Sequence, residues 1–317
     1  MDQSVEWTRA EVWKRKLLYP GHTLPTAAAP VAVAVGLAVH DHVFGPLAAL
    51  LAFLAGWLIQ LGGVLTDNYE NLVQQPQDPE HPELVRALAN GTLTLRGLRA
   101  AINACYGLAL LVGIYLVTHA GIGVIVIGLL SVGASLAYSA GPFPIGRHGL
   151  ADPLFFVFFG VVSVAGAYYV QAAPAHGAVL GSWLLPDALP AAAIALGIPV
   201  GALTTNILVI DDIRDRDFDA VKGKRTIAVR WGRKWSRVEY LALSLVAYLA
   251  PFALWLSSGF SAWVLLPLAT LPLAVSTARD VLTRARYEDL LPTTPRAGRL
   301  LLAYSGLLAA GTAMPGG

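Results

Sequence analysis

Nine apolar stretches, each long enough to cross a lipid bilayer as a helix, constrain the fold of this 317-residue chain more than any other feature. They span residues 24–40, 43–65, 98–118, 121–140, 153–171, 186–210, 240–257, 261–277 and 299–314. A membrane-spanning segment must satisfy its own backbone hydrogen bonds, and an α-helix does so. Only 13% of the residues are charged, compared with about 25% in ordinary soluble domains. We therefore expect an all-α, polytopic membrane protein with nine transmembrane helices.

The lysine and arginine residues indicate how these helices are oriented. Four of the 22 precede the first stretch, and three, one, nine and five accompany the connections after the second, fourth, sixth and eighth stretches. The other connections carry none. Because basic residues collect on the cytoplasmic side of a membrane, we expect the N-terminus in the cytoplasm, the C-terminus outside, and a location in the cytoplasmic (inner) membrane.

We expect the whole chain, residues 1–317, to form a single membrane domain. Residues 1–23 combine aromatic and basic side chains. This combination is typical of a helical arm in the headgroup region, although a simple orientation anchor would carry the same residues. Residues 66–97 and 211–239 form two long cytoplasmic loops that are rich in carboxylates. We expect the lipid bilayer, and no nucleic acid, as a partner, and leave protein partners open.

The stretch 211–226 reads DDIRDRDFDAVKGKRT and places carboxylates one helical turn apart. If the sixth helix continues, Asp211, Asp215 and Asp219 stay on one face, with Asp212 close to the same side. Carboxylates stacked in this way repel one another, so the pattern favours a bound cation. Aspartate oxygens suit Mg²⁺, which binds through one or two carboxylates together with substrate phosphate oxygens.

Basic residues beside this acidic stretch permit two interpretations. Lys224 and Arg225 follow it closely, in position to meet an anion such as a diphosphate. Alternatively, the stretch is a solvated loop in which Arg214 and Arg216 neutralise neighbouring carboxylates. Five of the 20 acidic residues fall within nine positions here, and this concentration in a chain with few charges favours a metal–diphosphate site.

Two segments carry a resemblance to a known family. Residues 206–232 resemble the second aspartate-rich motif of the UbiA-type membrane prenyltransferases. Residues 136–171 are similar to the Tyr-x-x-x-Pro, Gly-Leu-x-Asp, Phe-Phe-Gly and Tyr-Tyr segment of one branch, which prenylates 1,4-dihydroxy-2-naphthoate in menaquinone synthesis. The resemblance implies a helical bundle around a central cavity, an Mg²⁺ cofactor, a polyprenyl diphosphate donor and an aromatic acceptor.

The first aspartate-rich motif departs from the family pattern. The family form is Asn-Asp-x-x-Asp, whereas the matching residues here read DNYEN and place Asp67, Asn68 and Asn71 at the motif positions. One carboxylate has moved and one is lost, and a neutral asparagine holds Mg²⁺ more weakly than a carboxylate. Downstream, Arg86 stands where the family carries an arginine. The resemblance therefore implies a retained fold with an altered metal side.

From the pattern and the resemblance together, we expect three sets of site residues. The expected metal ligands are Asp67, Asn68, Asn71, Asp211, Asp212, Asp215 and Asp219. The expected catalytic residues are Asp215, Asp219, Lys224 and Arg225. The expected substrate-binding residues are Arg86, Tyr138, Arg147, Asp152 and Asn206.

Several of these side chains also have ordinary structural explanations. Asp152 would serve equally as an interfacial cap or ion pair, and Tyr138 as a packed ring. Asn206 lies inside the sixth stretch, where it would face either a cavity or a hydrogen-bonding neighbour helix.

The functional prediction is an integral membrane prenyltransferase, with 1,4-dihydroxy-2-naphthoate as the expected acceptor. Two alternatives stay open from the sequence. One is a transferase of the same superfamily that uses another acceptor, such as 4-hydroxybenzoate, a chlorophyllide or a phosphoribose. The other is a non-catalytic membrane protein, a transporter or a partner subunit, that keeps the fold, and the altered first motif favours this alternative.

Overall fold

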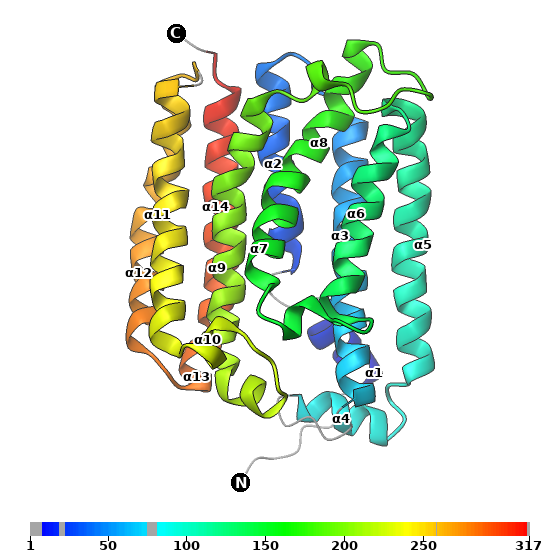
Figure 1. The fold of residues 1–317 in the computed structure, drawn as a ribbon, viewed down its shortest axis with the longest axis vertical. Coiled ribbons are helices and arrows are strands. Elements are labelled where there is room, and N and C mark those ends of the chain that lie inside the picture. Colours follow the sequence, from blue (N-terminus) through cyan, green and yellow to red (C-terminus); the bar gives the residue numbers. More distant parts are fainter. Residues whose placement is uncertain (1–7, 19–22, 75–80, 258, 316–317) are drawn as a thin grey trace.

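The computed structural model describes residues 8–18, 23–74, 81–257 and 259–315, and the regular structure in these residues is entirely helical. The helices stand side by side in an elongated bundle (Figure 1). Within the described residues, seven helical runs are long and apolar enough to cross a membrane: α2, α3, α5, α7 to η4, α9, α11 and η6 to α12. The prediction of an all-helical, multi-pass membrane protein is confirmed.

The first half of the chain contains α1 (Arg9–Val12), η1 (Trp13–Leu18), α2 (Thr23–His40), α3 (Pro46–Gln74), α4 (Pro82–Ala89), α5 (Leu95–Ala120), α6 (Gly123–Ser139), η2 (Ile145–Arg147), α7 (Ala151–Phe155) and η3 (Phe156–Val162). The second half contains α8 (Ser163–Ala172), η4 (Ala173–His176), η5 (Pro186–Ala188), α9 (Ala191–Val221), α10 (Ile227–Arg230), α11 (Arg233–Ser257), η6 (Ala262–Thr270), α12 (Leu271–Thr283), α13 (Tyr287–Leu290) and α14 (Thr293–Ala313). The helices η1 and η3 are π-helices, and η2, η4, η5 and η6 are 3₁₀-helices.

Two predicted spans, 121–140 and 299–314, correspond to α6 and α14. The apolar helix α6 has 17 residues. The 21-residue helix α14 begins with polar turns that include Arg296 and Arg299. Both helices lie within the bundle, and α14 packs against α2, α9 and η6. Neither helix has the apolar length of the seven runs: α6 is a short helix, and α14 is polar at its start.

The two predicted cytoplasmic loops are largely helical in the structure. Helix α3 continues to Gln74, so that Asp67, Asn68 and Asn71 lie on its last turns. Helix α9 continues to Val221 and carries the whole acidic stretch from Asp211 to Asp219. Residues 66–97 and 211–239 therefore differ from the predicted loops, since the motif side chains stand on ordered helix ends.

Helix α9 is the central helix of the bundle. Most of its apolar residues are buried, as expected for a helix that other helices enclose. Glycines permit its closest contact: a Cβ atom added to Gly160 on η3 would lie 2.4 Å from the Cα atom of Gly201 on α9. Such small residues allow two helix backbones to approach closely, so η3 and α9 hold a fixed relative position.

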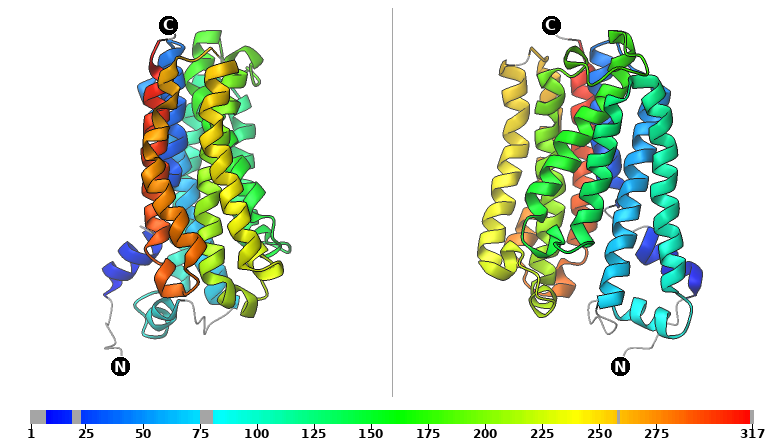
Figure 2. Two further views of the ribbon diagram at one scale, coloured as in Figure 1. Left: turned by 90° about the vertical axis from the view of Figure 1, so that its left-hand side faces the viewer. Right: turned by 45° about the vertical axis from the view of Figure 1, so that its right-hand side comes forward.

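Short helices gather at one end of the bundle, together with the acidic end of α9. Helices α4, α10 and α13 lie there (Figure 1), whereas α14 ends at the opposite end (Figure 2). Part of the predicted N-terminal arm is present as α1 and η1; residues 1–7 and 19–22 lie outside the described residues. Val12 and Leu17 of this arm are buried in an apolar cluster with Leu65, Leu72 and Leu84. The arm therefore packs against α3 and α4.

Candidate active site at the acidic end of α9

A pocket at this end of the bundle gathers side chains from distant parts of the sequence. It is lined by Asp67, Glu70, Asn71, Tyr138, Ser139, Gly146, Arg147 and Lys224. Helix α3 supplies the first three residues, the end of α6 and the following segment supply the next four, and the loop after α9 supplies the lysine. Five of the predicted site residues therefore meet in one pocket.

The α3 side of the pocket is held by neutral hydrogen-bond partners. Asp67 Oδ1 accepts a hydrogen bond of 2.7 Å from Ser139 Oγ, and Asp67 Oδ2 accepts one of 3.1 Å from Asn71 Nδ2. Asn68 Nδ2 donates to the Val64 carbonyl oxygen, at 2.8 Å, one turn earlier on the helix. Glu70 also lines the pocket. The sequence prediction left Glu70 out, and continuation of α3 as a helix explains its place.

The α9 side contains an arginine between two of the predicted carboxylates. Arg214 donates two hydrogen bonds to Asp215: Nε lies 2.7 Å from Oδ1 and Nη2 lies 2.6 Å from Oδ2. Its Nη1 atom lies 2.5 Å from Asp211 Oδ1 and 3.0 Å from Thr294 Oγ1 on α14. Thr294 in turn donates to Asp211 Oδ1 at 2.6 Å. The predicted neutralisation of carboxylates by Arg214 is therefore present for this pair.

Asp219 has a different cation beside it. Lys224 Nζ lies 2.8 Å from Asp219 Oδ1, and this carboxylate is only 2% exposed. The chain reverses after α9 because Gly223 adopts a left-handed conformation with φ of 72°, and the Lys224 backbone N–H then donates to the Asp219 carbonyl oxygen. This turn places Lys224 both against Asp219 and in the pocket lining. Asp212 is buried as well, where it interacts electrostatically with Asp219 and Lys224.

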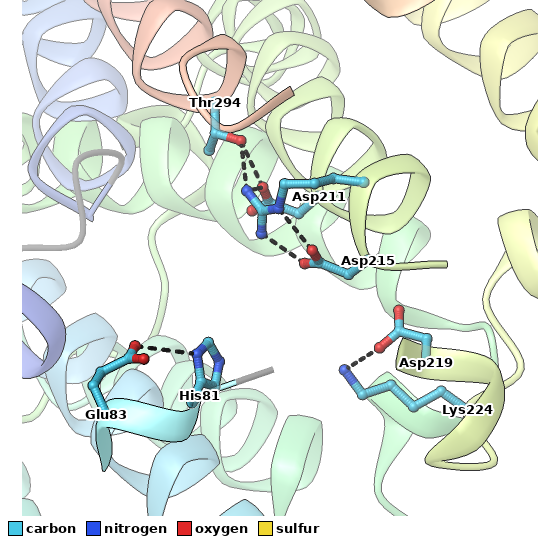
Figure 3. Close-up of polar contacts among 8 residues, drawn as sticks. His81, Glu83, Asp211, Asp215, Asp219, Lys224 and Thr294 are labelled. Carbon is cyan, nitrogen blue, oxygen red and sulfur yellow. Dashed lines mark hydrogen bonds and ion pairs between the residues drawn. The ribbon is translucent and has the colours of Figure 1, made fainter. Parts of the chain in front are cut away.

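Figure 3 shows how the acidic side chains of α9 are distributed. Asp211 and Asp215 surround the arginine next to Thr294, while Asp219 and Lys224 form a separate pair. His81, which caps the start of α4, and Glu83 on α4 lie apart from both groups, with His81 Nδ1 3.9 Å from Glu83 Oε1. The acidic residues of α9 therefore divide into two groups with different counter-cations.

The segment between α6 and α7 closes another side of the pocket. The Tyr138 ring lies against Gly146, where an added Cβ atom would come within 3.0 Å of ring atom Cζ. It also packs against Phe155, with ring centroids 5.6 Å apart. The backbone N–H of Arg225 donates to the Arg147 carbonyl oxygen at 2.9 Å. This bond ties the segment that carries Arg147 to the loop that carries Lys224.

Arg86, Asn206 and Arg225 are among the predicted site residues that do not line the pocket. Arg86 is exposed on α4, and its Nε atom donates to the Pro82 carbonyl oxygen within the same helix. Asn206 Nδ2 donates to Ser244 Oγ on α11 at 2.9 Å, which is the helix–helix contact considered above. The Arg225 residue is exposed. The Asn206 bond packs α9 against α11, while Asn206 Oδ1 is buried without a hydrogen-bond partner among the described residues, so a role of Asn206 in substrate binding stays a prediction.

Asp152 is buried at the start of α7, close to this site. It is 6% exposed, and its Oδ1 atom has no hydrogen-bond partner among the described residues. Its charge interacts with those of Asp212 on α9 and Glu239 on α11. A buried carboxylate oxygen of this kind needs a hydrogen-bond donor or a cation. Asp152 therefore has one oxygen available for a ligand close to the α9 carboxylates.

The chemistry of these residues fits a hard divalent cation. Within the described residues, no three histidine, cysteine, aspartate or glutamate side chains lie close enough to hold a metal ion by themselves. Mg²⁺ usually binds proteins through one or two carboxylates and takes its remaining ligands from substrate phosphates and water. The carboxylates of α3 and α9 are ligands of this type, and Lys224 brings a positive charge of the kind that pairs with a phosphate into the pocket lining.

Comparison with known proteins identifies the family. Residues 24–290 match the pattern described as the UbiA prenyltransferase family. The chain belongs to this family. As a UbiA-family member it is a membrane prenyltransferase, and the predictions of its family and enzyme class are confirmed.

Relatives and solved structures extend this UbiA assignment over most of the chain. The protein is 33% identical over 282 residues to the 1,4-dihydroxy-2-naphthoate octaprenyltransferase of Escherichia coli (strain K12), covering 87% of this chain and 86% of that one. It is 28% identical to the enzyme of the same name from Mycobacterium tuberculosis, over 89% and 91% of the two chains.

The fold is shared with UbiA homologues of known structure. The apo structure of a homologue from Aeropyrum pernix K1 superposes with a TM-score of 0.68 at 20% identity, covering 92% of this chain and 96% of that one. A homologue from Archaeoglobus fulgidus, bound to GPP and Mg²⁺, superposes with a TM-score of 0.63 at 15% identity, over 92% and 98%. These likenesses confirm the helical fold.

Proposed function

We propose that this UbiA-family enzyme transfers a polyprenyl group from its diphosphate to 1,4-dihydroxy-2-naphthoate, as a step of menaquinone synthesis. The observation that carries the proposal is the similarity to the Escherichia coli octaprenyltransferase over 87% of the chain. The pocket supports it independently, because acidic side chains from α3 face Arg147 and Lys224 across the same space. A diphosphate with a divalent cation is an anion–metal pair that such a mixed lining accommodates.

We propose nine transmembrane helices, with the N-terminus in the cytoplasm and the C-terminus outside, in the cytoplasmic membrane. The seven long apolar runs, together with α6 and α14, supply this number. The position of α14's last turns opposite α1 supports an odd number of crossings. The confinement of lysine and arginine to alternate connections supports the orientation.

The donor's diphosphate would lie in the pocket between α3 and Lys224. Mg²⁺ bound with it would neutralise part of the charge that develops on the leaving group. The proposed ligand set comprises Asp67, Asn68 and Asn71 on α3 and Asp211, Asp212, Asp215 and Asp219 on α9. Lys224 and Arg147 line the pocket and would donate hydrogen bonds to the diphosphate oxygens. Arg225 and Arg86 are exposed at the same end, where they would attract the anionic donor.

The reaction itself forms a carbon–carbon bond. The allylic carbon–oxygen bond of the donor breaks, its electron pair leaves with the diphosphate, and the electron-rich ring of the acceptor attacks the resulting allylic carbon. In the naphthoate case the attacked carbon then loses carbon dioxide, whose bonding electrons restore the aromatic ring. The protein must keep water from the allylic cation and hold the ring in line.

Aromatic residues are well placed for this task. Tyr138 lines the pocket and packs against Phe155 on α7, with ring centroids 5.6 Å apart. Phe155 packs against Phe159 on η3, with ring centroids 4.7 Å apart. Ring faces stabilise a nearby cation and exclude water. Asp152, buried with a hydrogen-bonding oxygen to spare, would accept a hydrogen bond from a hydroxyl group of the acceptor.

The experiment uses the purified full-length protein in nanodiscs with Mg²⁺, radiolabelled octaprenyl diphosphate and 1,4-dihydroxy-2-naphthoate. We expect a labelled lipophilic product from the wild type and from Asp217→Asn, an exposed carboxylate outside the pocket. Asp219→Asn should give little or no product. Product formed only with another aromatic acceptor would reassign the substrate, and absence of any product with every acceptor would favour a non-catalytic protein.

A further inference from the structure

Arg214 occupies a position that the proposed metal-assisted reaction does not explain. Its guanidinium contacts Asp215 through two nitrogens, Asp211 and Thr294 through a third, and lies over the Tyr287 ring with Cζ 5.6 Å from the centroid. The arginine side chain is 15% exposed, and those of Asp211 and Asp215 are 20% and 9% exposed. A largely buried guanidinium with this many partners is held in one place.

Two carboxylates one helical turn apart repel each other unless a cation lies between them. In this structure the protein supplies that cation, since Arg214 comes from the same helix as both carboxylates. Thr294 fixes the arrangement from outside, because its hydroxyl donates to Asp211 and accepts from Arg214. The cluster joins α9 to α14 without any ligand, and it carries one net negative charge.

On the basis of the proposed function, we infer that Arg214 is an internal counter-cation that competes with the metal ion for Asp211 and Asp215 and favours the anionic metal–diphosphate complex over the free metal. The electrostatic reason has two parts. A fixed positive charge beside the carboxylates weakens their attraction for a divalent cation. The same charge strengthens binding of a diphosphate, which arrives with a net negative charge. Arg214 would therefore keep the site from filling with metal before the donor is present.

The other arginine of the same helix supplies a matched control. Arg216 donates to Asp217 at 2.9 Å and to the Ala228 carbonyl oxygen at 2.9 Å, whereas the partners of Arg214 are Asp211, Asp215 and Thr294. Replacing Arg216 by glutamine removes the same charge two positions away along α9. A general effect of net charge on metal binding would appear in both variants, whereas competition at the cluster would appear only at Arg214.

The test measures metal binding and substrate kinetics separately. Mn²⁺ is titrated into the full-length protein in nanodiscs without any diphosphate, and free Mn²⁺ is followed by electron paramagnetic resonance. We expect Arg214→Gln to bind Mn²⁺ about tenfold more tightly than the wild type, since a full charge is removed within hydrogen-bond distance of the carboxylates. The KM for octaprenyl diphosphate should rise by about the same factor. Arg216→Gln should change neither quantity by more than about twofold.

Opposite shifts in the two quantities distinguish this role from a structural one. If Arg214 only braced α9 against α14, its removal would weaken metal and donor binding together, and that result would overturn the inference. Unchanged Mn²⁺ affinity would overturn it as well.

Two further measurements keep the inference falsifiable if Arg214→Gln folds poorly. Arg214→Lys retains the charge but reaches fewer oxygens, so its Mn²⁺ affinity should lie between those of the wild type and the glutamine variant; a weaker affinity than the wild type would contradict competition. The metal-free thermal midpoint of either variant should fall, and Mn²⁺ should restore it further than it raises the midpoint of the wild type. Mn²⁺ binding requires no prenyl transfer. A wild type without transferase activity would therefore contradict the proposed function, while the Mn²⁺ titration would still test the role of Arg214.

Discussion

The two sides of the site hold their carboxylates in different ways. On α3, Asp67 accepts hydrogen bonds from the neutral side chains of Ser139 and Asn71. On α9, Asp215 and Asp219 pair with Arg214 and Lys224. Neutral donors orient a carboxylate without cancelling its charge, whereas a cation does both. The α3 side therefore presents uncancelled negative charge to the pocket, while on the α9 side Arg214 and Lys224 already cancel part of the negative charge.

This difference bears on the unusual first motif. The α3 side carries fewer carboxylates than the family pattern, but Asp67 remains and Glu70 lies beside it in the pocket lining. The α9 side carries five aspartates within nine positions and supplies its own cations. A metal ion bound with diphosphate needs only one or two protein carboxylates. The loss of one acidic residue from α3 is thus compatible with a working site.

Removing the cation of the α9 side that lines the pocket should have the largest effect. Lys224→Ala should lower kcat/KM for prenyl transfer by at least about 100-fold, because both the diphosphate and the buried Asp219 lose their ammonium partner. Initial rates with radiolabelled donor measure the effect. Lys234→Ala, an exposed lysine at the start of α11, serves as the control. A Lys224→Ala rate close to that of this control would remove Lys224 from the site.

Removing the retained carboxylate of the other side should have the next largest effect. Asp67→Asn keeps the hydrogen-bonding shape but cancels the charge, so we expect kcat/KM to fall by about 10- to 100-fold, with a higher Mg²⁺ requirement. Mg²⁺ titrations of the initial rate measure both changes. Asp187→Asn, an exposed aspartate on η5, provides the control. Should Asp67→Asn show the Mg²⁺ requirement of the wild type, the α3 side would have no part in binding the metal.

The sequence predicted the contents of the site better than its arrangement. Apolar length sufficed for the helical, multi-pass membrane fold, because a bilayer permits few alternatives. The acidic residues of α9 were identified from a helical period alone. That period could not show that Asp211 and Asp215 share Arg214, since the outcome depends on Thr294, which lies 83 positions from Asp211 and approaches only in the folded bundle.

Two residues show what the pattern in one segment leaves open. Asn206 was predicted as a site residue because a polar side chain inside a span needs a partner, and the structure gives its amide nitrogen one in Ser244 on α11. Glu70 was not among the predicted ligands, since neighbouring residues of a helix point about 100° apart, whereas it lines the pocket together with Asn71. Tertiary neighbours and pocket linings arise only in the folded bundle, and periodicity in one segment does not determine them.

A third prediction sharpens the role of the ring that stands between the two sides. Tyr138→Leu should lower kcat by about tenfold, because the pocket loses an aromatic face suited to stabilising a cation. Tyr138→Phe keeps the ring and should stay within about threefold of the wild type. Single-turnover rates with bound donor measure the chemical step for both variants. Equal losses in the two would instead assign the effect to the hydroxyl group.

The smallest expected effect comes from restoring a carboxylate to α3. Asn71 donates to Asp67 Oδ2 at 3.1 Å, and Asn71→Asp would replace this hydrogen bond with two like charges one turn apart. The metal-free protein should therefore lose a little thermal stability, while the added charge should tighten Mg²⁺ binding by about threefold. Thermal unfolding with and without Mg²⁺ measures both effects, and Asn90→Asp at the exposed end of α4 adds the same charge outside the pocket. If Asn71→Asp bound Mg²⁺ no more tightly than Asn90→Asp, the α3 carboxylates would be oriented away from the metal. In that case the α9 carboxylates would have to hold the ion, although Arg214 and Lys224 weaken their attraction for a cation.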